Sequence, residues 1–216
     1  LGFGLDCESH YSGEGLVLDQ EGCGHFSLHN IQIDLKIPGR HNVYNALAAA
    51  AVGAQCGIPP DETGAALNEF KPFNMRSEIL RKNGFFVIND CYNASPTSAE
   101  AALNLLGDME LGEEGKRIAV LGDMLELGDM SQALHSELGR SVFRVGVDML
   151  LTYGHLSRFI EGAARKAGMK CVQHFDDKGE LAIHLSRVAQ AGDAILVKAS
   201  RDVAFEDVVE HLLVSS

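Results

Sequence analysis

The chain has 216 residues, enough for one large domain or two small ones, and its 46% hydrophobic content suffices for an ordinary packed core. Its 30 Asp and Glu residues against 18 Lys and Arg give a formal net charge of −12, which disfavours nucleic acid and anionic membranes, because both are bound through basic faces. No stretch reaches the roughly 20 apolar residues of a membrane-spanning helix, and five cysteines without a C-x-x-C pair indicate reduced thiols, so we expect a cytoplasmic protein without membrane insertion.

The first part of the chain is predicted to form short strands followed by two helices. The strands are expected over 16–19, 25–29 and 31–37, and the helices over 42–56 and 58–70. The segment IQIDLKI alternates apolar and polar residues, which is typical of a half-exposed strand. A domain boundary is expected near Arg76, which divides the chain into domains 1–76 and 77–216.

After this boundary the pattern changes to short apolar strands that alternate with helices. A hairpin is expected to turn on Asn83-Gly84. Further strands are predicted over 117–123, 148–154, 170–175 and 193–200, and helices over 98–106, 130–145, 157–167, 179–191 and 204–213. This alternation indicates an α/β fold, with a mostly parallel sheet that carries helices on both faces.

The familiar phosphate-binding motifs are missing or incomplete. No G-x-G-x-x-G follows a predicted strand. The segment GEEGKR, residues 112–117, imitates a phosphate loop, but its glycine spacing is short, Arg117 replaces the Mg²⁺-binding hydroxyl, and it precedes a strand. We interpret this segment as a solvated turn.

Polar or glycine-bearing segments end four of the predicted strands. They are Asn89–Asn93, Gly122–Met124, Tyr153–His155 and Lys198–Arg201. Ligands of open parallel sheets bind beyond the carboxyl ends of the strands, so a site is expected at this edge. The alternative is that these loops are polar because they contact water, as loops do in any protein.

A second group of polar side chains stands at the start of the helix predicted after Gly39. His41, Asn42 and Asn45 lie there within a few residues of one another. Two carboxamides at a helix start suit the edge of a purine, since each can pair a donor and an acceptor with adenine. An ordinary helix with Asn42 as its N-cap is the open alternative.

Five segments resemble the Mur ligases and occur in the order found in that family. They are GRHNVYNALAA, NMRSE, INDCYNASPTSAEAAL, VLGDMLELG and LVKASRDVAFEDVV. The resemblance covers nearly the whole chain and implies an ATP-dependent amide-forming enzyme of peptidoglycan precursor synthesis. The blocks DCYNASP, GDMLELG and VKASR are most similar to the member that adds D-alanyl-D-alanine to UDP-N-acetylmuramoyl-tripeptide, which makes these two molecules the expected partners.

The resemblance also implies which part of such an enzyme this chain represents. Residues 1–76 match the end of the central ATPase domain, and 77–216 match the C-terminal domain with its dinucleotide-fold-like sheet. The family's phosphate loop, Mg²⁺-binding Glu and carbamoylated lysine lie upstream, and the chain begins without Met. We therefore expect a fragment that is inactive alone, belongs to a monomeric ATP- and Mg²⁺-dependent enzyme, and holds no metal itself.

The resemblance assigns nucleotide contacts to residues of both parts. Asn42 and Asn45 match amides that line the adenine pocket, and His41 shares their motif. Arg76 matches an arginine that reaches the ATP phosphates, which suits the rigid fork of donors on a guanidinium. Without the resemblance, an ion pair between Arg76 and Glu78 is the simpler interpretation.

The resemblance also implies that the strand end after residue 88 contacts the ribose of ATP. Asp90 matches the acidic residue that accepts hydrogen bonds from the ribose of ATP. Tyr92 and Asn93 lie beside it and are expected to help hold the nucleotide or the incoming dipeptide. The alternative is that Asp90 or Asn93 caps the next helix.

The loop at the last strand end is expected to face the acceptor substrate. It contains Lys198, Ser200 and Arg201, and its cations suit the carboxylate of D-alanyl-D-alanine. The alternative for Arg201 is a surface ion pair with Asp202 or Glu206.

The acidic loop with Asp123, Glu126 and Asp129 either holds the dipeptide's ammonium group or is a solvated, helix-capping loop.

Two other functions stay open for the chain as a whole: a sibling amino-acid ligase of the same family, and a non-catalytic module that binds a nucleotide or a partner.

Overall fold

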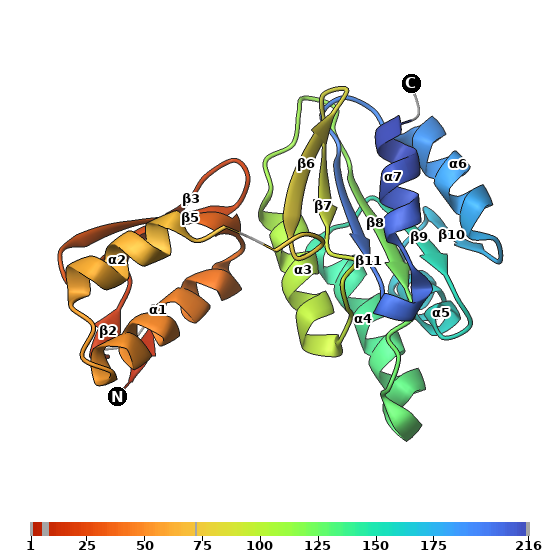
Figure 1. Ribbon diagram of the computed structural model, residues 1–216. Coiled ribbons are helices and arrows are strands. Elements are labelled where there is room, and N and C mark those ends of the chain that lie inside the picture. Colours follow the sequence, from red (N-terminus) through yellow and green to blue (C-terminus); the bar gives the residue numbers. More distant parts are fainter. Residues whose placement is uncertain (1, 6–8, 72, 215–216) are drawn as a thin grey trace. The chain divides into compact units, whose positions relative to one another are not determined.

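The computed structural model describes residues 2–5, 9–71 and 73–214 (Figure 1). The chain divides into two compact units, Leu1–Phe73 and Asn74–Ser216, which we call the N-terminal and the C-terminal unit. The division falls a few residues before Arg76, where the sequence predicts a domain boundary. Each unit is described by itself below.

The N-terminal unit is a small antiparallel sheet with two helices. Its elements are β1 (Phe3–Gly4), β2 (Tyr11–Ser12), β3 (Glu14–Leu18), β4 (Cys23–Leu28), β5 (Ile31–Pro38), α1 (Arg40–Gln55) and α2 (Pro60–Glu69). The strands β3, β4 and β5 pair in that order, and β1 and β2 form a separate short parallel pair. Along β5, Ile33 and Leu35 are buried while Gln32, Asp34 and Lys36 are exposed, which confirms the predicted alternation.

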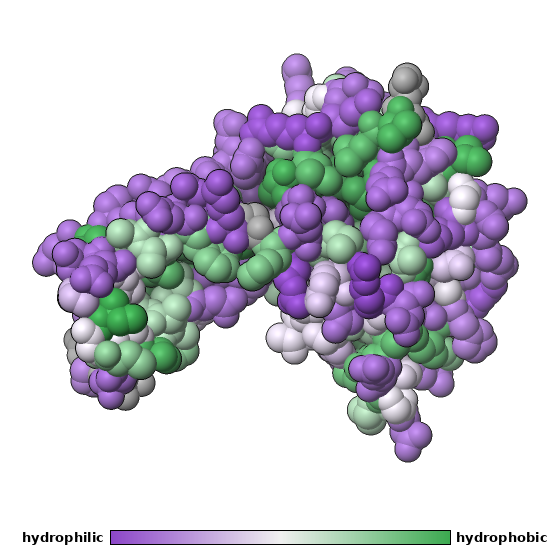
Figure 2. Space-filling model, in the orientation of Figure 1, coloured by the Kyte–Doolittle hydropathy of each residue, from purple (hydrophilic) through white to green (hydrophobic). Residues whose placement is uncertain are grey.

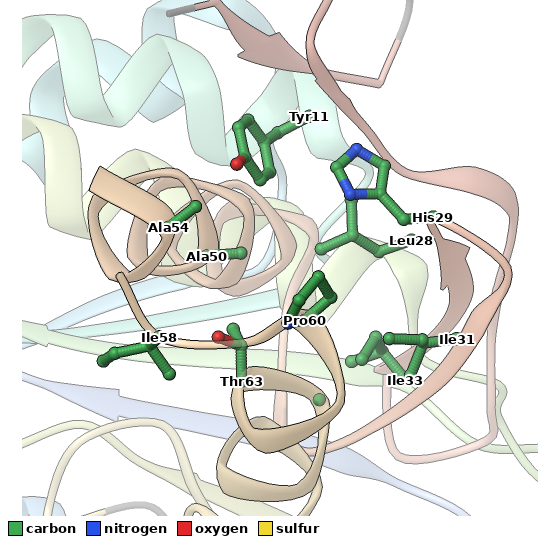
Figure 3. Close-up of a pocket in the computed structure, with 11 residues that line it drawn as sticks. Tyr11, Leu28, His29, Ile31, Ile33, Ala50, Ala54, Ile58, Pro60 and Thr63 are labelled. Atoms are coloured by element: carbon green, nitrogen blue, oxygen red, sulfur yellow. The ribbon is translucent and has the colours of Figure 1, made fainter. Parts of the chain in front are cut away.

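A small cavity lies between the sheet and the helices of the N-terminal unit (Figure 3). Its walls are mostly apolar and come from β4, β5, α1 and α2, with Ile33, Ala50 and Ile58 among the lining residues. The cavity volume is about 20 Å³, which is room for a single water molecule. The cavity is therefore a packing gap, too small for a ligand site.

The C-terminal unit is an α/β sandwich. Its elements are β6 (Glu78–Lys82), β7 (Phe85–Asn89), α3 (Pro96–Asp108), β8 (Arg117–Gly122), η1 (Gly128–Met130), α4 (Ser131–Val145), β9 (Met149–Tyr153), α5 (Ser157–Ala167), β10 (Val172–Phe175), α6 (Lys178–Val188), β11 (Ala194–Lys198), η2 (Arg201–Val203) and α7 (Glu206–Val214). The sheet order is β10-β9-β8-β11-β7-β6, with every pair parallel except β6 and β7. The predicted fold class is confirmed.

Alternate residues of the central strands build a core on each face of this sheet. Ile88, Leu121 and Leu196 pack with α3, α4 and α5, whereas their chain neighbours Val87, Val120 and Val197 pack with α6 and α7. Figure 1 shows α3 and α4 on one side of the sheet and α6 and α7 on the other. Strands buried on both faces explain why they read as continuous apolar runs in the sequence.

Local signals account for the ends of several elements. Ser95 caps α3 and forms a reciprocal capping box with Ser98. Helices α4 and α5 end at Gly146 and Gly168, both in the left-handed conformation that glycine adopts without strain. The β6–β7 hairpin turns on Asn83-Gly84, as predicted, with positive φ at both residues.

The segment GEEGKR is a turn, as interpreted from the sequence, and its glycines permit a close backbone approach. The Gly112 N–H donates to the Gly192 carbonyl oxygen at 3.0 Å. A Cβ atom at Gly115 would lie 2.0 Å from the same oxygen, so the position requires glycine.

Hydrophilic residues cover most of the visible surface in Figure 2, with apolar residues in smaller patches. Within the described ranges, no helix has both the length and the apolar character needed to span a membrane. Cys23, Cys56, Cys91 and Cys171 are free thiols, and Cys7 lies outside the described residues.

Candidate functional site

A groove of about 430 Å³ opens at the carboxyl edge of the six-stranded sheet. Three loops line it: Tyr92–Ser95 after β7, Leu125–Leu127 after β8, and Ser200–Asp202 after β11. These loops are adjacent because β11 lies between β7 and β8. The groove is therefore at the edge where open parallel sheets bind ligands. The predicted strand ends Asn89–Asn93 and Lys198–Arg201 contribute lining residues, and Gly122–Met124 directly precedes the third lining loop.

Ser200 joins the three loops of the groove. Its N–H donates to the Asp123 carbonyl oxygen at 2.9 Å, and its Oγ accepts the Leu125 N–H at 2.9 Å. The same hydroxyl donates to the Ala94 carbonyl oxygen at 3.4 Å. Ser200 is buried, and its contacts connect the three loops that line the groove.

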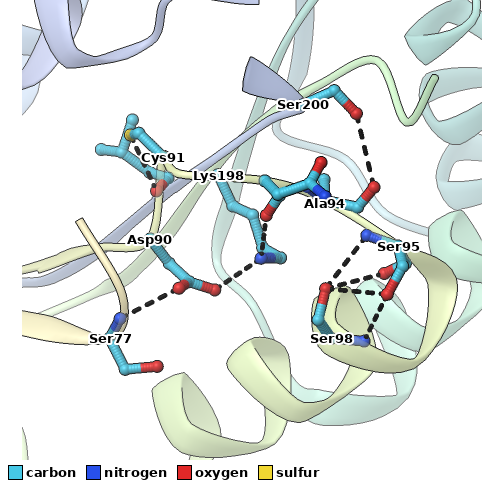
Figure 4. A network of polar contacts seen from close by, with 10 residues as sticks. Ser77, Asp90, Cys91, Ala94, Ser95, Ser98, Lys198 and Ser200 are labelled. Atoms are coloured by element: carbon cyan, nitrogen blue, oxygen red, sulfur yellow. Dashed lines mark hydrogen bonds and ion pairs between the residues drawn. The ribbon is translucent and has the colours of Figure 1, made fainter. Parts of the chain in front are cut away.

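A buried ion pair lies beside the groove (Figure 4). Lys198 is 2% exposed, and its Nζ lies 2.6 Å from Asp90 Oδ2 and donates to the Asn93 carbonyl oxygen at 2.8 Å. The other carboxylate oxygen of Asp90 accepts the Ser77 N–H at 2.9 Å. The two charges satisfy each other, as burial of charge requires. Lys198 is thus enclosed, whereas the sequence places it among the acceptor-binding residues.

Two guanidinium groups lie near the ring of Tyr92. The Arg76 guanidinium is 4.2 Å from the ring centroid, and that of Arg201 is 6.0 Å away. Arg201 also pairs with Glu206 at 3.2 Å, which confirms the ion pair considered as its alternative. Each guanidinium group offers a planar fork of donors, so this corner attracts phosphate or carboxylate groups.

Glu78 was the alternative partner for Arg76. Among the described contacts, its Oε2 accepts the Met75 N–H at 3.2 Å and the Asn89 side-chain amide at 2.9 Å. Glu78, at the start of β6, therefore links the backbone of Met75 to Asn89 at the end of β7.

The structure corrects the capping alternatives. Helix α3 is capped by Ser95, and the Asn93 side chain accepts the Ala94 N–H at 2.8 Å, so neither Asp90 nor Asn93 is the cap. Helix α1 begins at Arg40 with Gly39 as N-cap, so Asn42 lies inside its first turn. The alternative for α1 placed the helix start too late and the alternative for α3 placed it too early, because the sequence signal of a cap is accurate only to a few residues.

The predicted adenine-binding residues lie together on the first turns of α1. The Asn42 amide donates to the Pro38 carbonyl oxygen at 2.8 Å, and the Asn45 amide donates to Asn42 Oδ1 at 3.0 Å. The His41 ring folds back over Gly39, where a Cβ atom would lie 2.5 Å from the ring. Gly39 has φ 102, so this tight start of α1 depends on glycine.

The acidic loop is divided between two environments. Asp123 is buried, and its Oδ1 accepts the Ser157 N–H at 2.7 Å, which joins the end of β8 to the start of α5. Gly154 faces this carboxylate, because a Cβ there would lie 2.4 Å from Asp123 Oδ1. Glu126 lines the groove and is exposed, whereas Asp129 lies in η1 and is also exposed.

His135 positions the loop after β8, and sequence reasoning missed it. The ring is fully buried; Nε2 accepts the Met124 N–H at 2.9 Å, and Nδ1 is 2.6 Å from the Ser131 carbonyl oxygen, to which it donates. The next residue, Leu125, lines the groove. In the sequence, His135 precedes Leu138 and Val142 by three and seven residues, and both of these are buried. This helical spacing was the available signal for a histidine on the core face of α4.

The buried cysteines offer no reactive thiol, and the described residues form no metal cluster. Burial raises the pKa of the Cys91 thiol far above its ordinary value, and Cys91 Sγ donates to the Val197 carbonyl oxygen at 3.4 Å. Burial, with Asp19 and Glu21 nearby, raises the pKa of Cys23 to about 12. Both thiols therefore stay protonated and unreactive. Across 2–5, 9–71 and 73–214, no three His, Cys, Asp or Glu residues are arranged to hold a metal ion.

Two family models match the chain, and both describe parts of Mur ligases. The model of the Mur ligase glutamate ligase domain matches residues 75–201, and that of the Mur ligase middle domain matches residues 2–53. These two matches fall in the C-terminal and the N-terminal unit, respectively.

Relatives of known name are similar over most of this chain. The UDP-N-acetylmuramoyl-tripeptide–D-alanyl-D-alanine ligase of Bacillus subtilis is 39% identical over 99% of this chain and 47% of its own length. The ligase of the same name from Escherichia coli is 36% identical over 85% of this chain and 39% of its own length. The chain thus spans about half or less of these relatives.

Solved structures agree with these similarities. MurF from Acinetobacter baumannii superposes with a TM-score of 0.83 and 26% identity, over 98% of this chain and 46% of that one. MurF from Thermotoga maritima, solved in complex with ADP, superposes with a TM-score of 0.78 and 25% identity, over 97% of this chain and 47% of that one.

Proposed function

This chain belongs to the Mur ligase family, and we propose that it is part of an ATP-dependent ligase that joins D-alanyl-D-alanine to UDP-N-acetylmuramoyl-tripeptide. Support comes from the relatives of that name, which are 39% and 36% identical to it. The observation that carries the proposal is the groove at the carboxyl edge of the sheet, with its cationic corner. We place the reaction in the cytoplasm, as a step of peptidoglycan precursor synthesis.

In the proposed reaction, the terminal phosphoryl group of ATP passes to the terminal carboxylate of the tripeptide and gives an acyl phosphate and ADP. The amine of D-alanyl-D-alanine then attacks the acyl carbon, phosphate leaves with the bonding electron pair, and the amine nitrogen releases a proton to water as the amide forms. Such a reaction depends on positioning and on neutralising charge more than on covalent help from the protein. Mg²⁺ would accompany ATP, held by residues beyond this chain.

The C-terminal unit would receive the dipeptide in its groove. The volume of about 430 Å³ lies in the range of small-molecule sites. Arg201 lines the groove and is partly exposed, so its guanidinium is the group we assign to the dipeptide carboxylate. Glu126, exposed on the opposite loop, is the available partner for the dipeptide ammonium group.

Nucleotide contacts are assigned within each unit by itself. We assign the adenine edge to Asn42 and Asn45, with His41 beside them, and the ATP phosphates to Arg76. Asp90 uses two of the roughly four acceptor positions of a carboxylate, which leaves capacity for ribose hydroxyls. Tyr92 and Asn93 would complete that contact.

The acceptor role of Arg201 is tested by replacing it with glutamine in the intact ligase. We expect the KM for D-alanyl-D-alanine to rise by about 10- to 100-fold, because a charge-assisted contact is lost, while the KM for ATP stays unchanged. Arg187→Gln, on the exposed face of α6, is the matched control. Equal changes in both KM values would contradict the assignment.

The reaction itself is tested by phosphate release with different acceptors. We expect release with D-alanyl-D-alanine and none with single amino acids. Release with a single amino acid instead would identify a sibling ligase. An Arg76→Ala ligase with unchanged ATP turnover would show that Arg76 does not act on the phosphates.

A further inference from the structure

We propose that Lys198 and Asp90 form a clamp that fixes the segment Met75–Ser77 against the end of β7, so that Lys198 is a positioning residue. Lys198 lies on β11 and Asp90 directly after β7, on neighbouring parallel strands. The clamp itself follows from contacts within the C-terminal unit. Only the use made of Arg76, inside the clamped segment, rests on the proposed function.

The clamped segment has an unusual backbone. Met75 has φ 60 and Ser77 has φ 49, so two residues with side chains adopt the left-handed conformation on either side of Arg76. Such conformations are uncommon outside glycine and persist where surrounding contacts impose them. The segment therefore needs specific contacts to keep its shape.

Two of those contacts come from the end of β7, and a third comes from β6, where Glu78 Oε2 accepts the Met75 N–H at 3.2 Å. The Ser77 N–H donates to Asp90 Oδ1 at 2.9 Å, and the Tyr92 N–H donates to the Met75 carbonyl oxygen at 3.0 Å. The ring of Tyr92 then lies 4.2 Å from the Arg76 guanidinium. Asp90 and Tyr92 thus determine where Arg76 points.

Asp90 can hold Ser77 only while its own charge is compensated. The residue is 9% exposed, and a buried carboxylate without a partner would turn toward water. Lys198 supplies the opposite charge at 2.6 Å and keeps the carboxylate in place (Figure 4). It also bonds the Asn93 carbonyl oxygen at 2.8 Å, which fixes the loop that carries Tyr92. A single ammonium group therefore supports the two contacts that Asp90 and Tyr92 make to the segment.

The clamp is testable through the peptide bond between Arg76 and Ser77, which is a trypsin site. Its amide is the group that Asp90 holds, and cleavage requires that amide to leave the protein surface. In Lys198→Met, we expect trypsin to cut after Arg76 about tenfold faster than in the unmodified chain, since a charge-assisted hydrogen bond is lost. Cleavage after Lys170, in an exposed loop of the same unit, should keep its rate.

Lys178→Met is the matched control. Lys178 Nζ also contacts a carboxylate, Asp207 at 2.5 Å, and two backbone carbonyls, but it lies at the start of α6 and none of its partners belongs to the clamped segment. We expect this variant to leave cleavage after Arg76 unchanged. A rise equal to that of Lys198→Met would overturn the proposal.

A second variant decides the matter if Lys198→Met does not fold. Asp90→Asn keeps the shape and an acceptor oxygen, but it removes the charge, and its amide hydrogens would face the ammonium group of Lys198. We expect faster hydrogen exchange of the Ser77 amide, with the core amide of Ile195 unchanged. Unaltered exchange at Ser77, or equal acceleration at Ser77 and Ile195, would overturn the clamp, because it would show that Lys198 and Asp90 only stabilise the fold.

Discussion

Replacing His135 by leucine removes a buried side chain that holds both the Met124 amide and the Ser131 carbonyl oxygen. Leucine fills a similar volume, so the change isolates the polar contacts. The Met124 N–H would be left buried without an acceptor, at about 1–3 kcal/mol, and loss of the second hydrogen bond adds about 1 kcal/mol. We therefore expect the free energy of unfolding to fall by about 2–4 kcal/mol.

Urea unfolding followed by circular dichroism measures this loss. With a slope of roughly 2 kcal/mol per molar urea, the transition midpoint of the C-terminal unit should fall by about 1–2 M. His135→Gln keeps an oxygen acceptor within the site and should lose less than His135→Leu. His155→Gln, at an exposed position, is the control. A loss below about 0.5 kcal/mol in His135→Leu would refute the reasoning, because it would show that the Met124 amide finds another partner.

Other predictions concern packing, capping and pH. Gly139→Ala should lose about 1–3 kcal/mol in urea unfolding, since the new Cβ would lie 2.3 Å from the Ile160 carbonyl oxygen; Gly162→Ala, which has open space, should be neutral or gain up to about 1 kcal/mol. Ser95→Ala should lose about 0.5–2 kcal/mol of stability by removing the cap of α3, and an unchanged melting curve would contradict this. Burial, helped by a nearby arginine, lowers the pKa of His174 in the folded chain, so stability should fall as pH drops below about 6.5, where the unfolded histidine takes up a proton; His174→Gln should flatten that decline.

Local patterns in the sequence determine which residues are buried and where the elements lie. In β5, the alternation of Ile33 and Leu35 with polar neighbours predicts the inward face, because successive side chains of a strand point to opposite sides. In the C-terminal unit, continuous apolar strands that alternate with helices predict a parallel sheet covered on both faces. The turn at Asn83-Gly84 was equally predictable, since both residues tolerate positive φ. Each of these inferences depends on residues within a few positions of one another.

The partners of the buried polar side chains were decided only by the tertiary structure. Chain order does not reveal that β11 enters the sheet between β7 and β8, and that insertion brings Lys198 to Asp90 across 108 residues. The sequence predicts Lys198 as a contact of the acceptor substrate. In the structure, Lys198 is buried and pairs with the Asp90 carboxylate. The physical reason is that periodicity reports the face on which a residue lies, whereas the energy of a buried charge depends on which opposite charge the strand order places beside it.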